Sequence, residues 1–242
     1  MASGGDGPPR HEQIAADIRA RIMAGDLPPG AQLPSIPTLV TRYSAATATV
    51  QRALANLKAE GSVYSEVGKG VYVRDRQPLV VEAAAYVVPT PGGYTYRLIG
   101  VAEIVPPTEV ARGLGLAEGE SAVLRHRLLL FGGEPVELSW SYYPSAIASG
   151  TELAGRKKIS GGAARVLSDL GHPQQELLDR VSARMPTSEE IEALALPPYV
   201  PVMRQFRVIR SSAGQPVEVS ILIKGSHLHE LRYGHTVAGD VS

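Results

Sequence analysis

The sequence predicts an α+β protein of two domains: a small N-terminal domain of helices that ends in a β-hairpin, and a larger C-terminal domain in which an antiparallel sheet carries helices. Three observations predict this architecture. Apolar residues recur at helical intervals in the first quarter of the chain, apolar and polar residues alternate after residue 80, and the second half contains an internal repeat. At 242 residues the chain is also longer than most single domains.

The composition excludes several classes of protein. The 24 Lys and Arg residues balance the 24 Asp and Glu residues, which argues against a protein that coats nucleic acid without specificity. The absence of cysteine excludes disulfide frameworks, cysteine catalysis and thiolate metal sites. No apolar run approaches the length of a membrane span, and the first nine residues are too polar for a signal peptide. We therefore expect a cytoplasmic protein with no membrane partner and no cofactor.

The first helix is predicted by a regular apolar spacing. Ile14, Ile18 and Ile22 lie four residues apart, which predicts an amphipathic helix over residues 10–24 that Gly25 ends. Residues 1–9 are rich in glycine and proline, and we expect them to form a disordered tail. The first domain should therefore begin at residue 10.

Two further helices and a hairpin are predicted next. Ser35 is a natural N-cap for a short helix, and after a turn of small residues Val50 and Leu54 belong to the apolar face of a helix over residues 47–60. Two short strands then flank a glycine-rich tip at residues 68–70. Two helices joined by a tight turn and followed by a hairpin describe a winged helix-turn-helix over residues 10–75, which places its second helix in a DNA major groove.

The residues expected to contact DNA have short polar, methyl-bearing or basic side chains, or are glycines at the hairpin tip. We expect Lys69 to bind phosphate in any sequence, and Gln51 and Arg52 to contact base edges. A winged helix used only for protein contacts is the alternative. The candidate DNA-binding residues are Ser35, Arg42, Tyr43, Thr47, Ala48, Thr49, Gln51, Arg52, Gly68, Lys69 and Gly70.

After a polar linker at residues 76–80, the second domain contains two similar segments about eighty residues apart. Each is expected to be a capped helix, at 107–116 and 186–196, followed by a β-hairpin, at 122–139 and 202–220. We expect the two hairpins to join in one antiparallel sheet with helices on one face, and a cleft can form where the halves meet.

Polar residues recur at matching positions of the two repeats. Strand alternation puts Glu137, Ser139, Ser141 and Tyr143 on one face, which is either a ligand-binding face or the solvated side of the sheet. The matched pairs are Arg127 with Arg207, Glu137 with Glu218, and Ser139 with Ser220.

Two arginines lie on one face of the strand that begins at residue 122. For Arg125 we expect a salt bridge to Glu137 across the hairpin, and for Arg127 a contact with the ligand.

The N-terminal residues resemble the DNA-binding domain of GntR-type bacterial transcription regulators. Two departures from the family pattern affect DNA contacts. Ile36 stands where the family usually has an acidic residue, and Ala45-Ala46-Thr47 replaces Val-Ser-Arg, which removes a capping hydroxyl and an arginine that contacts DNA in relatives. The resemblance rests on Gln13-Ile14-Ala15, Gly25-Asp26-Leu27, Leu33-Pro34-Ser35, Thr49-Val50, Glu60-Gly61 and Gly68-Lys69-Gly70.

The second domain, at 81–242, resembles the UTRA domain of the HutC subfamily, whose fold is similar to chorismate lyase. The resemblance rests on Leu114-Gly115-Leu116, Gly133-Glu134-Pro135-Val136, Tyr143-Pro144 and Leu231-Arg232-Tyr233. It implies an effector-binding domain that also pairs two chains as a homodimer. Of the three positions that hold ligand in sugar-phosphate-sensing members, only Arg127 is retained, which disfavours a phosphosugar. The candidate effector-binding residues are Arg127, Glu137, Ser139, Tyr143, Ser160, Glu218 and Ser220.

The sequence thus predicts a sequence-specific DNA-binding transcription regulator, a repressor that a small-molecule effector releases from a palindromic operator in double-stranded DNA. A ligand-independent factor for plasmid maintenance or replication is an alternative. A lyase-like enzyme is a weaker one, because no Gly-x-Ser-x-Gly, phosphate-loop or His-Glu-x-x-His motif is present. His227 and His229, with His235 nearby, invite a metal site, but no carboxylate has convincing spacing, so we expect no metal.

Overall fold

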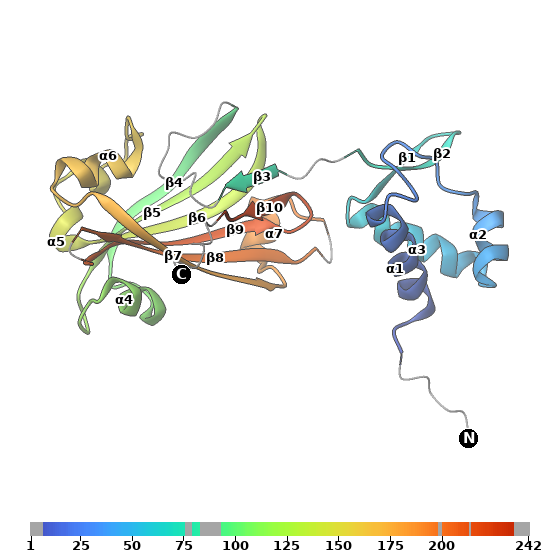
Figure 1. The fold of residues 1–242 in the computed structure, drawn as a ribbon, viewed down its shortest axis with the longest axis horizontal. Coiled ribbons are helices and arrows are strands. Elements are labelled where there is room, and N and C mark those ends of the chain that lie inside the picture. Colours follow the sequence, from blue (N-terminus) through green and yellow to red (C-terminus); the bar gives the residue numbers. More distant parts are fainter. Residues whose placement is uncertain (1–6, 76–78, 83–92, 198–199, 213, 235–242) are drawn as a thin grey trace, which may run out of the picture. The chain divides into compact units, whose positions relative to one another are not determined.

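The structure is a computed structural model that forms two compact units, residues 1–77 and most of residues 78–242 (Figure 1). Within the described residues, no helix is both long enough and apolar enough to cross a bilayer. Residues 1–6 of the predicted disordered tail (1–9), most of the predicted linker, and His235 lie outside the described residues. The structure describes residues 7–75, 79–82, 93–197, 200–212 and 214–234.

The N-terminal unit has the predicted order of three helices and a hairpin. Buried apolar side chains from all three helices form its core, among them Ile14, Ile18, Leu39, Val50 and Leu57. The predicted winged helix-turn-helix arrangement is therefore confirmed. Its elements are α1 (Arg10–Met23), α2 (Ile36–Tyr43), α3 (Thr47–Ala59), β1 (Val63–Glu66) and β2 (Gly70–Val73).

The C-terminal unit is built on one six-stranded antiparallel sheet with the order β4-β5-β6-β9-β8-β7. This confirms the predicted α+β fold class. The strands are β4 (Tyr94–Ile104), β5 (Ala122–Phe131), β6 (Glu134–Pro144), β7 (Gln174–Arg184), β8 (Val202–Ser211) and β9 (Pro216–Gly225).

The internal repeat is visible in the strand register. Hairpin β5–β6 aligns Arg127 with Ser139, and hairpin β8–β9 aligns Arg207 with Ser220, so the residues matched in sequence occupy equivalent ladder positions. The two hairpins join through β6 and β9, as the repeat predicted.

Helices cover both faces of this sheet, whereas the sequence predicted helices on one face only. The helices of the repeats, α4 (Thr108–Leu114) and α7 (Ser188–Ala193), pack on the face that carries Leu138 and Trp140. The segment between the repeats forms α5 (Ser145–Ala148), the 3₁₀ helix η2 (Glu152–Ala154) and α6 (Gly162–Asp169).

This inserted segment packs on the opposite face. Its apolar residues Leu153 and Leu167 contact a cluster that includes Val123 and Tyr143. Figure 1 accordingly shows α6 and α4 on opposite sides of the sheet. The prediction failed because the segment lies outside the repeat and has an apolar side of its own to bury.

A separate two-stranded ladder follows the linker. Strand β3 (Leu79–Glu82) pairs in parallel with β10 (His229–Arg232), close to the end of the chain. Leu79 and Val80, which the sequence assigned to the linker, therefore lie in a strand. Strand β3, the first strand after the linker, is therefore held by β10, the last strand of the C-terminal unit.

The predicted helix caps are found in only one repeat. At α7, the Thr187 hydroxyl accepts from the Glu190 amide at 3.3 Å, and the Glu190 carboxylate accepts from the Thr187 amide at 2.8 Å, which is a capping box. Arg184 also donates to both Glu190 oxygens, at 2.7 and 2.6 Å. At α4 the N-cap is Pro107, which makes no side-chain cap bond.

We expect Glu190→Gln to lower the free energy of unfolding by about 1–3 kcal/mol at pH 7, because the charged hydrogen bonds with Arg184 are lost even though Gln can keep the capping-box acceptor. Burial raises the pKa of Glu190, but the hydrogen bonds from Arg184 and Thr187 outweigh it and leave the pKa below its usual value. This contribution is therefore present above the unfolded-state pKa of about 4.3 and is lost as the pH falls through the folded-state value.

Urea unfolding at several pH values measures this effect. The gap between wild type and Glu190→Gln should shrink as the pH falls below about 4. The control is Glu189→Gln, an exposed residue in the same helical turn, which should change stability by less than about 0.5 kcal/mol. Equal losses in the two variants would contradict the role of the ion pair between Glu190 and Arg184.

Candidate DNA-binding surface and effector-binding face

Helix α3 presents the predicted polar and methyl-bearing residues on the side away from the core. Thr47, Ala48, Gln51 and Arg52 are exposed, and Thr49 is half-buried. The buried residues of α3 are Val50, Ala53, Leu54 and Leu57. The exposed side of α3 is thus free to enter a groove of DNA.

The start of each helix in the helix-turn-helix is capped differently. Ser35 is the N-cap of α2, and its hydroxyl accepts from the Thr38 amide at 3.4 Å, as the sequence predicted. Ala46 is the N-cap of α3 and provides no side-chain bond. Ser44 does not replace the missing cap, because it adopts a left-handed conformation (φ 45°) at the end of α2. The first amides of α3 therefore have no side-chain cap.

The end of α2 is tied to α1. The Tyr43 hydroxyl donates to the Asp17 carboxylate at 2.6 Å, and Arg10 donates to the Tyr43 carbonyl at 2.8 Å. Burial, together with Asp17, raises the pKa of the Tyr43 phenol. The hydroxyl proposed for a phosphate contact is thus engaged within the domain, whereas Arg42 is exposed.

The hairpin tip is held by a residue that precedes α2. The Gln32 side-chain amide donates to the Lys69 carbonyl at 2.7 Å. Gly70 has φ 137°, and a Cβ there would lie 2.7 Å from the Gln32 amide nitrogen, so this position requires glycine. The Lys69 ammonium lies 3.1 Å from the Glu66 carboxylate but is largely exposed, so it remains accessible to phosphate. The sequence did not predict the role of Gln32.

The polar residues of the central strands lie on one face, as alternation predicted, and this face is buried. Ser139, Ser141 and Tyr143 are fully buried, and Glu137 and Ser220 nearly so. The interpretation as a solvated side of the sheet is therefore wrong. We call the following residues the polar face: Arg127, Glu137, Ser139, Ser141, Tyr143, Asp179, Gln205, Arg207, Glu218, Ser220 and Lys224.

A chain of hydrogen bonds crosses from the first repeat to the second. Arg127 donates to the Ser141 hydroxyl at 2.6 Å, and this hydroxyl lies 2.7 Å from that of Ser220. Ser220 in turn donates to Glu218 at 2.7 Å, and Gln174 donates to the second Glu218 oxygen at 3.2 Å. Three of the predicted effector residues, Arg127, Ser220 and Glu218, are therefore connected through the Ser141 hydroxyl.

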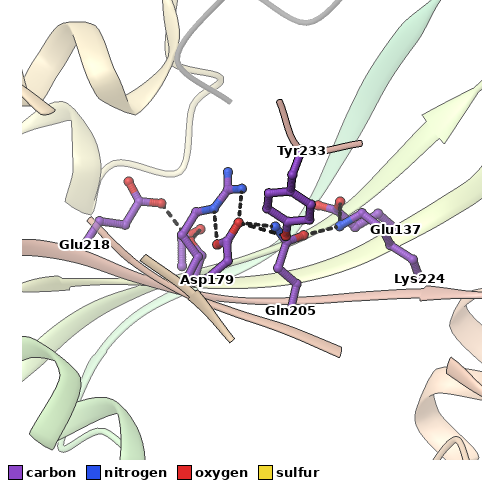
Figure 2. A network of polar contacts seen from close by, with 9 residues as sticks. Glu137, Asp179, Gln205, Glu218, Lys224 and Tyr233 are labelled. Atoms are coloured by element: carbon purple, nitrogen blue, oxygen red, sulfur yellow. Dashed lines mark hydrogen bonds and ion pairs between the residues drawn. The ribbon is translucent and has the colours of Figure 1, made fainter. Parts of the chain in front are cut away.

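Two ion pairs and an amide form a second chain (Figure 2). Arg207 donates two hydrogen bonds of 2.8 Å to Asp179, and Gln205 donates to the same carboxylate at 2.8 Å. Lys224 donates to Gln205 at 3.1 Å and lies 2.7 Å from the Glu137 carboxylate. Each buried charge here has a partner of opposite sign, as burial requires.

The ionisation of these groups follows from burial and pairing. Burial lowers the pKa of Lys224, although Glu137 opposes the shift. Burial raises the pKa of Asp179, but Arg207 and Gln205 outweigh it and leave the pKa below its usual value. Burial raises the pKa of the Tyr143 phenol well above its usual value, so its hydroxyl stays protonated.

Five members of this face were not among the predicted site residues: Ser141, Asp179, Gln205, Arg207 and Lys224. Arg207 is the repeat partner of Arg127, and this match was a signal that could have identified it. Asp179 lies on β7, which the sequence analysis did not predict as a strand. Its pairing with Arg207 depends on strand order at the edge of the sheet.

Arg125 does not form the predicted salt bridge with Glu137. The guanidinium donates to backbone carbonyls of the η2 segment, at 2.8 Å to Leu153, 2.6 Å to Gly155 and 3.1 Å to Lys157. Glu137 pairs with Lys224 instead. Arg125 therefore fixes a loop, which sequence spacing could not indicate.

Ser160 lies beyond this loop and is exposed. The sequence placed it at the start of a helix, but α6 begins at Gly162 with Gly161 as its N-cap. The Ser160 carbonyl accepts from Arg165 at 2.7 Å. Among the described contacts, its hydroxyl does not join the chains of the polar face.

The two repeats differ at one position that matters for ligand binding. Arg207 pairs with Asp179 on β7, whereas the residue in register with Arg127 on β4 is Leu98. In the part of the chain that the structure describes, Arg127 has no ion pair. Its Nε atom and the Ser139 hydroxyl are both buried without a hydrogen-bond partner there. The first repeat thus retains polar groups that can bind a ligand.

The histidines near the C-terminus do not form a metal centre with other described residues. His229 is buried, and its Nδ1 lies 3.2 Å from the Gly225 carbonyl. The described ranges contain no group of three or more His, Asp or Glu side chains that could hold a metal ion.

Comparison with known proteins agrees with both units. Residues 10–73 match the bacterial regulatory proteins of the gntR family, and residues 92–226 match the UTRA domain. The chain is therefore a DNA-binding transcription regulator with a separate UTRA domain. It belongs to the GntR family and has the domain composition of the HutC subfamily that the sequence predicted.

Individual relatives support this assignment. A helix-turn-helix transcriptional regulator of Streptomyces coelicolor is 31% identical over 239 residues, which cover 88% of this chain and 87% of the relative. The mannosyl-D-glycerate transport and metabolism repressor of Escherichia coli is 36% identical over 69 residues, which cover 28% of this chain and 29% of that protein. A crystal structure of a GntR-family regulator has a TM-score of 0.66 at 23% identity and covers 95% of this chain and 98% of its own, which shows the shared fold.

The buried pair of Lys224 and Glu137 gives a test of the polar face. We expect Lys224→Met to lower the free energy of unfolding by about 3–5 kcal/mol, because the Glu137 carboxylate stays buried after its ammonium partner is removed. The double variant Glu137→Leu with Lys224→Met should lose less than the single variant. Urea unfolding measures both, and a double variant less stable than the single one would contradict this account.

Proposed function

We propose that this protein is a repressor that a small-molecule effector releases from a palindromic operator. The observation that carries the proposal is the buried polar face with Arg127, which forms no ion pair with the described residues, in a UTRA domain joined to a winged helix-turn-helix. The E. coli relative is named as a repressor, which supports repression over activation. The family assignment favours regulation over the lyase-like enzyme that the fold suggested.

We propose further that the protein acts as a homodimer in the cytoplasm, with its UTRA domains pairing the chains. A two-fold dimer presents two α3 helices to half-sites about one DNA turn apart, which explains why a palindrome suits it. No membrane partner is part of the proposal.

The proposed DNA contacts divide into two kinds. Gln51 and Arg52 contact base edges from α3, with Thr47, Ala48 and Thr49 beside them. Arg42 and Lys69 bind phosphate at either side, and the tip glycines let the backbone approach the DNA. Ser35 caps α2 so that its first amides face the phosphate backbone. Tyr43 contributes through its position, since its hydroxyl is bound to Asp17.

Selection of DNA from a random pool tests this division. Wild-type protein should enrich a palindrome with half-sites about one turn apart. Lys69→Ala should weaken binding to all sequences and lower the salt dependence by about one charge, whereas Gln51→Ala or Arg52→Ala should relax preference at particular base pairs, at a cost of about 1–3 kcal/mol. Titration of selected and mismatched sites measures both effects, and equal effects from all three variants would refute the division.

The effector is proposed to carry an anionic group that binds Arg127. The three carboxylates of the polar face already have partners, so an arriving anion meets Arg127 as the cation of the polar face that has no ion pair among the described residues. Ser139 and Tyr143 are within the same face and can donate to the ligand. Glu137, Glu218 and Ser220 line the same face, and Ser160 is retained by resemblance to the family.

Arg127→Met tests this role. Carboxylates and phosphates that raise the melting temperature of wild type should not raise that of Arg127→Met, because the charge-assisted hydrogen bond is lost. A ligand at a hundred times its Kd stabilises by about 2.7 kcal/mol, which corresponds to several degrees. The matched control is Arg97→Met, an exposed arginine on β4, which should respond like wild type.

The outcome also separates a ligand-controlled repressor from a ligand-independent plasmid factor. In the first case the stabilising compounds release selected DNA from wild type but not from Arg127→Met. If no compound of either class both stabilises the wild-type protein and releases DNA, the ligand-independent alternative is favoured.

A further inference from the structure

The strand that follows the linker is held by the C-terminal strand of the same unit. β3 and β10 pair in parallel from Leu79 with His229 to Glu82 with Arg232. The Leu79 amide also donates to the Leu228 carbonyl at 2.7 Å. The position of β10 therefore sets where the chain leaves the linker and enters the UTRA domain.

β10 is anchored at both ends, but to different parts of the unit. At its start, His229 is buried and its ring lies 3.2 Å from the Gly225 carbonyl at the end of β9. Directly after its end, the Tyr233 hydroxyl donates to the Asp179 carboxylate at 3.3 Å (Figure 2). The second anchor is a direct hydrogen bond to a carboxylate of the polar face.

The bond from Tyr233 is the easiest of the Asp179 contacts to replace. The same Asp179 oxygen accepts from Gln205 and Arg207, each at 2.8 Å. The bond from Tyr233 is 0.5 Å longer than these and comes from a neutral donor, whereas Arg207 is charged. Tyr233 is also about half exposed, whereas Asp179 and Arg207 are buried. A ligand that competes for Asp179 displaces the phenol before it displaces the guanidinium.

We propose that Tyr233 is the positioning residue that couples occupancy of the polar face to the linker. In the structure, Asp179 holds Tyr233, Tyr233 holds β10, and β10 holds β3. A bound effector that donates a hydroxyl or ammonium hydrogen bond to Asp179 replaces the phenol and loosens β10 and β3 together. This inference rests on the proposed effector function of the face, and it assigns Tyr233 a role that does not depend on direct contact with the ligand.

Hydrogen exchange on the full-length protein tests whether Tyr233 holds β10 and β3 in place. In Tyr233→Phe, the backbone amides of β3 and β10 should exchange about tenfold faster than in wild type, while those of β5 and β6 keep their rates. The control is Tyr142→Phe, which removes a hydroxyl on the opposite face of the sheet. It should leave exchange in β3 and β10 unchanged. Unchanged exchange of β3 in Tyr233→Phe would overturn the proposal.

DNA affinity tests whether loosening of β10 and β3 weakens DNA binding. With a DNA fragment that wild type selects from a random pool, Tyr233→Phe should bind at least fivefold more weakly at constant salt, because it mimics the effector-bound state. Tyr142→Phe should bind within twofold of wild type. Faster exchange in β3 with unchanged affinity would also overturn the proposal. If wild type selects no DNA, the proposed function fails instead, and the exchange experiment alone then decides whether Tyr233 holds β3.

Discussion

The constraint on which the C-terminal unit depends is that charges buried in the middle of a sheet must be paired. Glu137 with Lys224, and Asp179 with Arg207, are buried ion pairs on neighbouring strands of one face. A slip of one residue in any of these strands would turn a charge into the apolar face under α4 and α7. Such pairs give little net stability, so we interpret them as fixing the register of the sheet.

The repeat gives this face an approximate symmetry, and the edge strands break it. The hairpins supply Arg127 and Arg207 at equivalent positions, but β7 supplies a carboxylate and β4 supplies Leu98. One half is therefore satisfied by the protein itself, and the other half keeps buried donors unused among the described residues. The difference at the sheet edges thus leaves Arg127 available for the ligand that we propose.

Sequence reasoning predicted what local periodicity determines. The spacing of Ile14, Val50 and Leu54 predicted the helices, and strand alternation put Glu137 and Ser139 on one face. Contacts that depend on strand order could not be predicted from the sequence. The burial of the polar face and the partner of Asp179 arise from elements distant in sequence. A helix after Ser160 was predicted, but the face on which the helices between the repeats pack was not, because that segment has no counterpart in the second copy to compare with. The roles of the individual DNA-contacting and effector residues are still predictions.

The hydrogen bond from Gln32 to the hairpin tip has a consequence for the choice of operator. Because it ties the wing to the residues just before α2, it limits changes in the separation between the wing and the helices, the two parts that we propose to approach DNA. A duplex whose helical parameters do not match that separation must twist or bend to meet both. For DNA bound in the proposed way, the energy of this deformation depends on base steps that no side chain touches, so the stiffness of those steps would contribute to discrimination between operators.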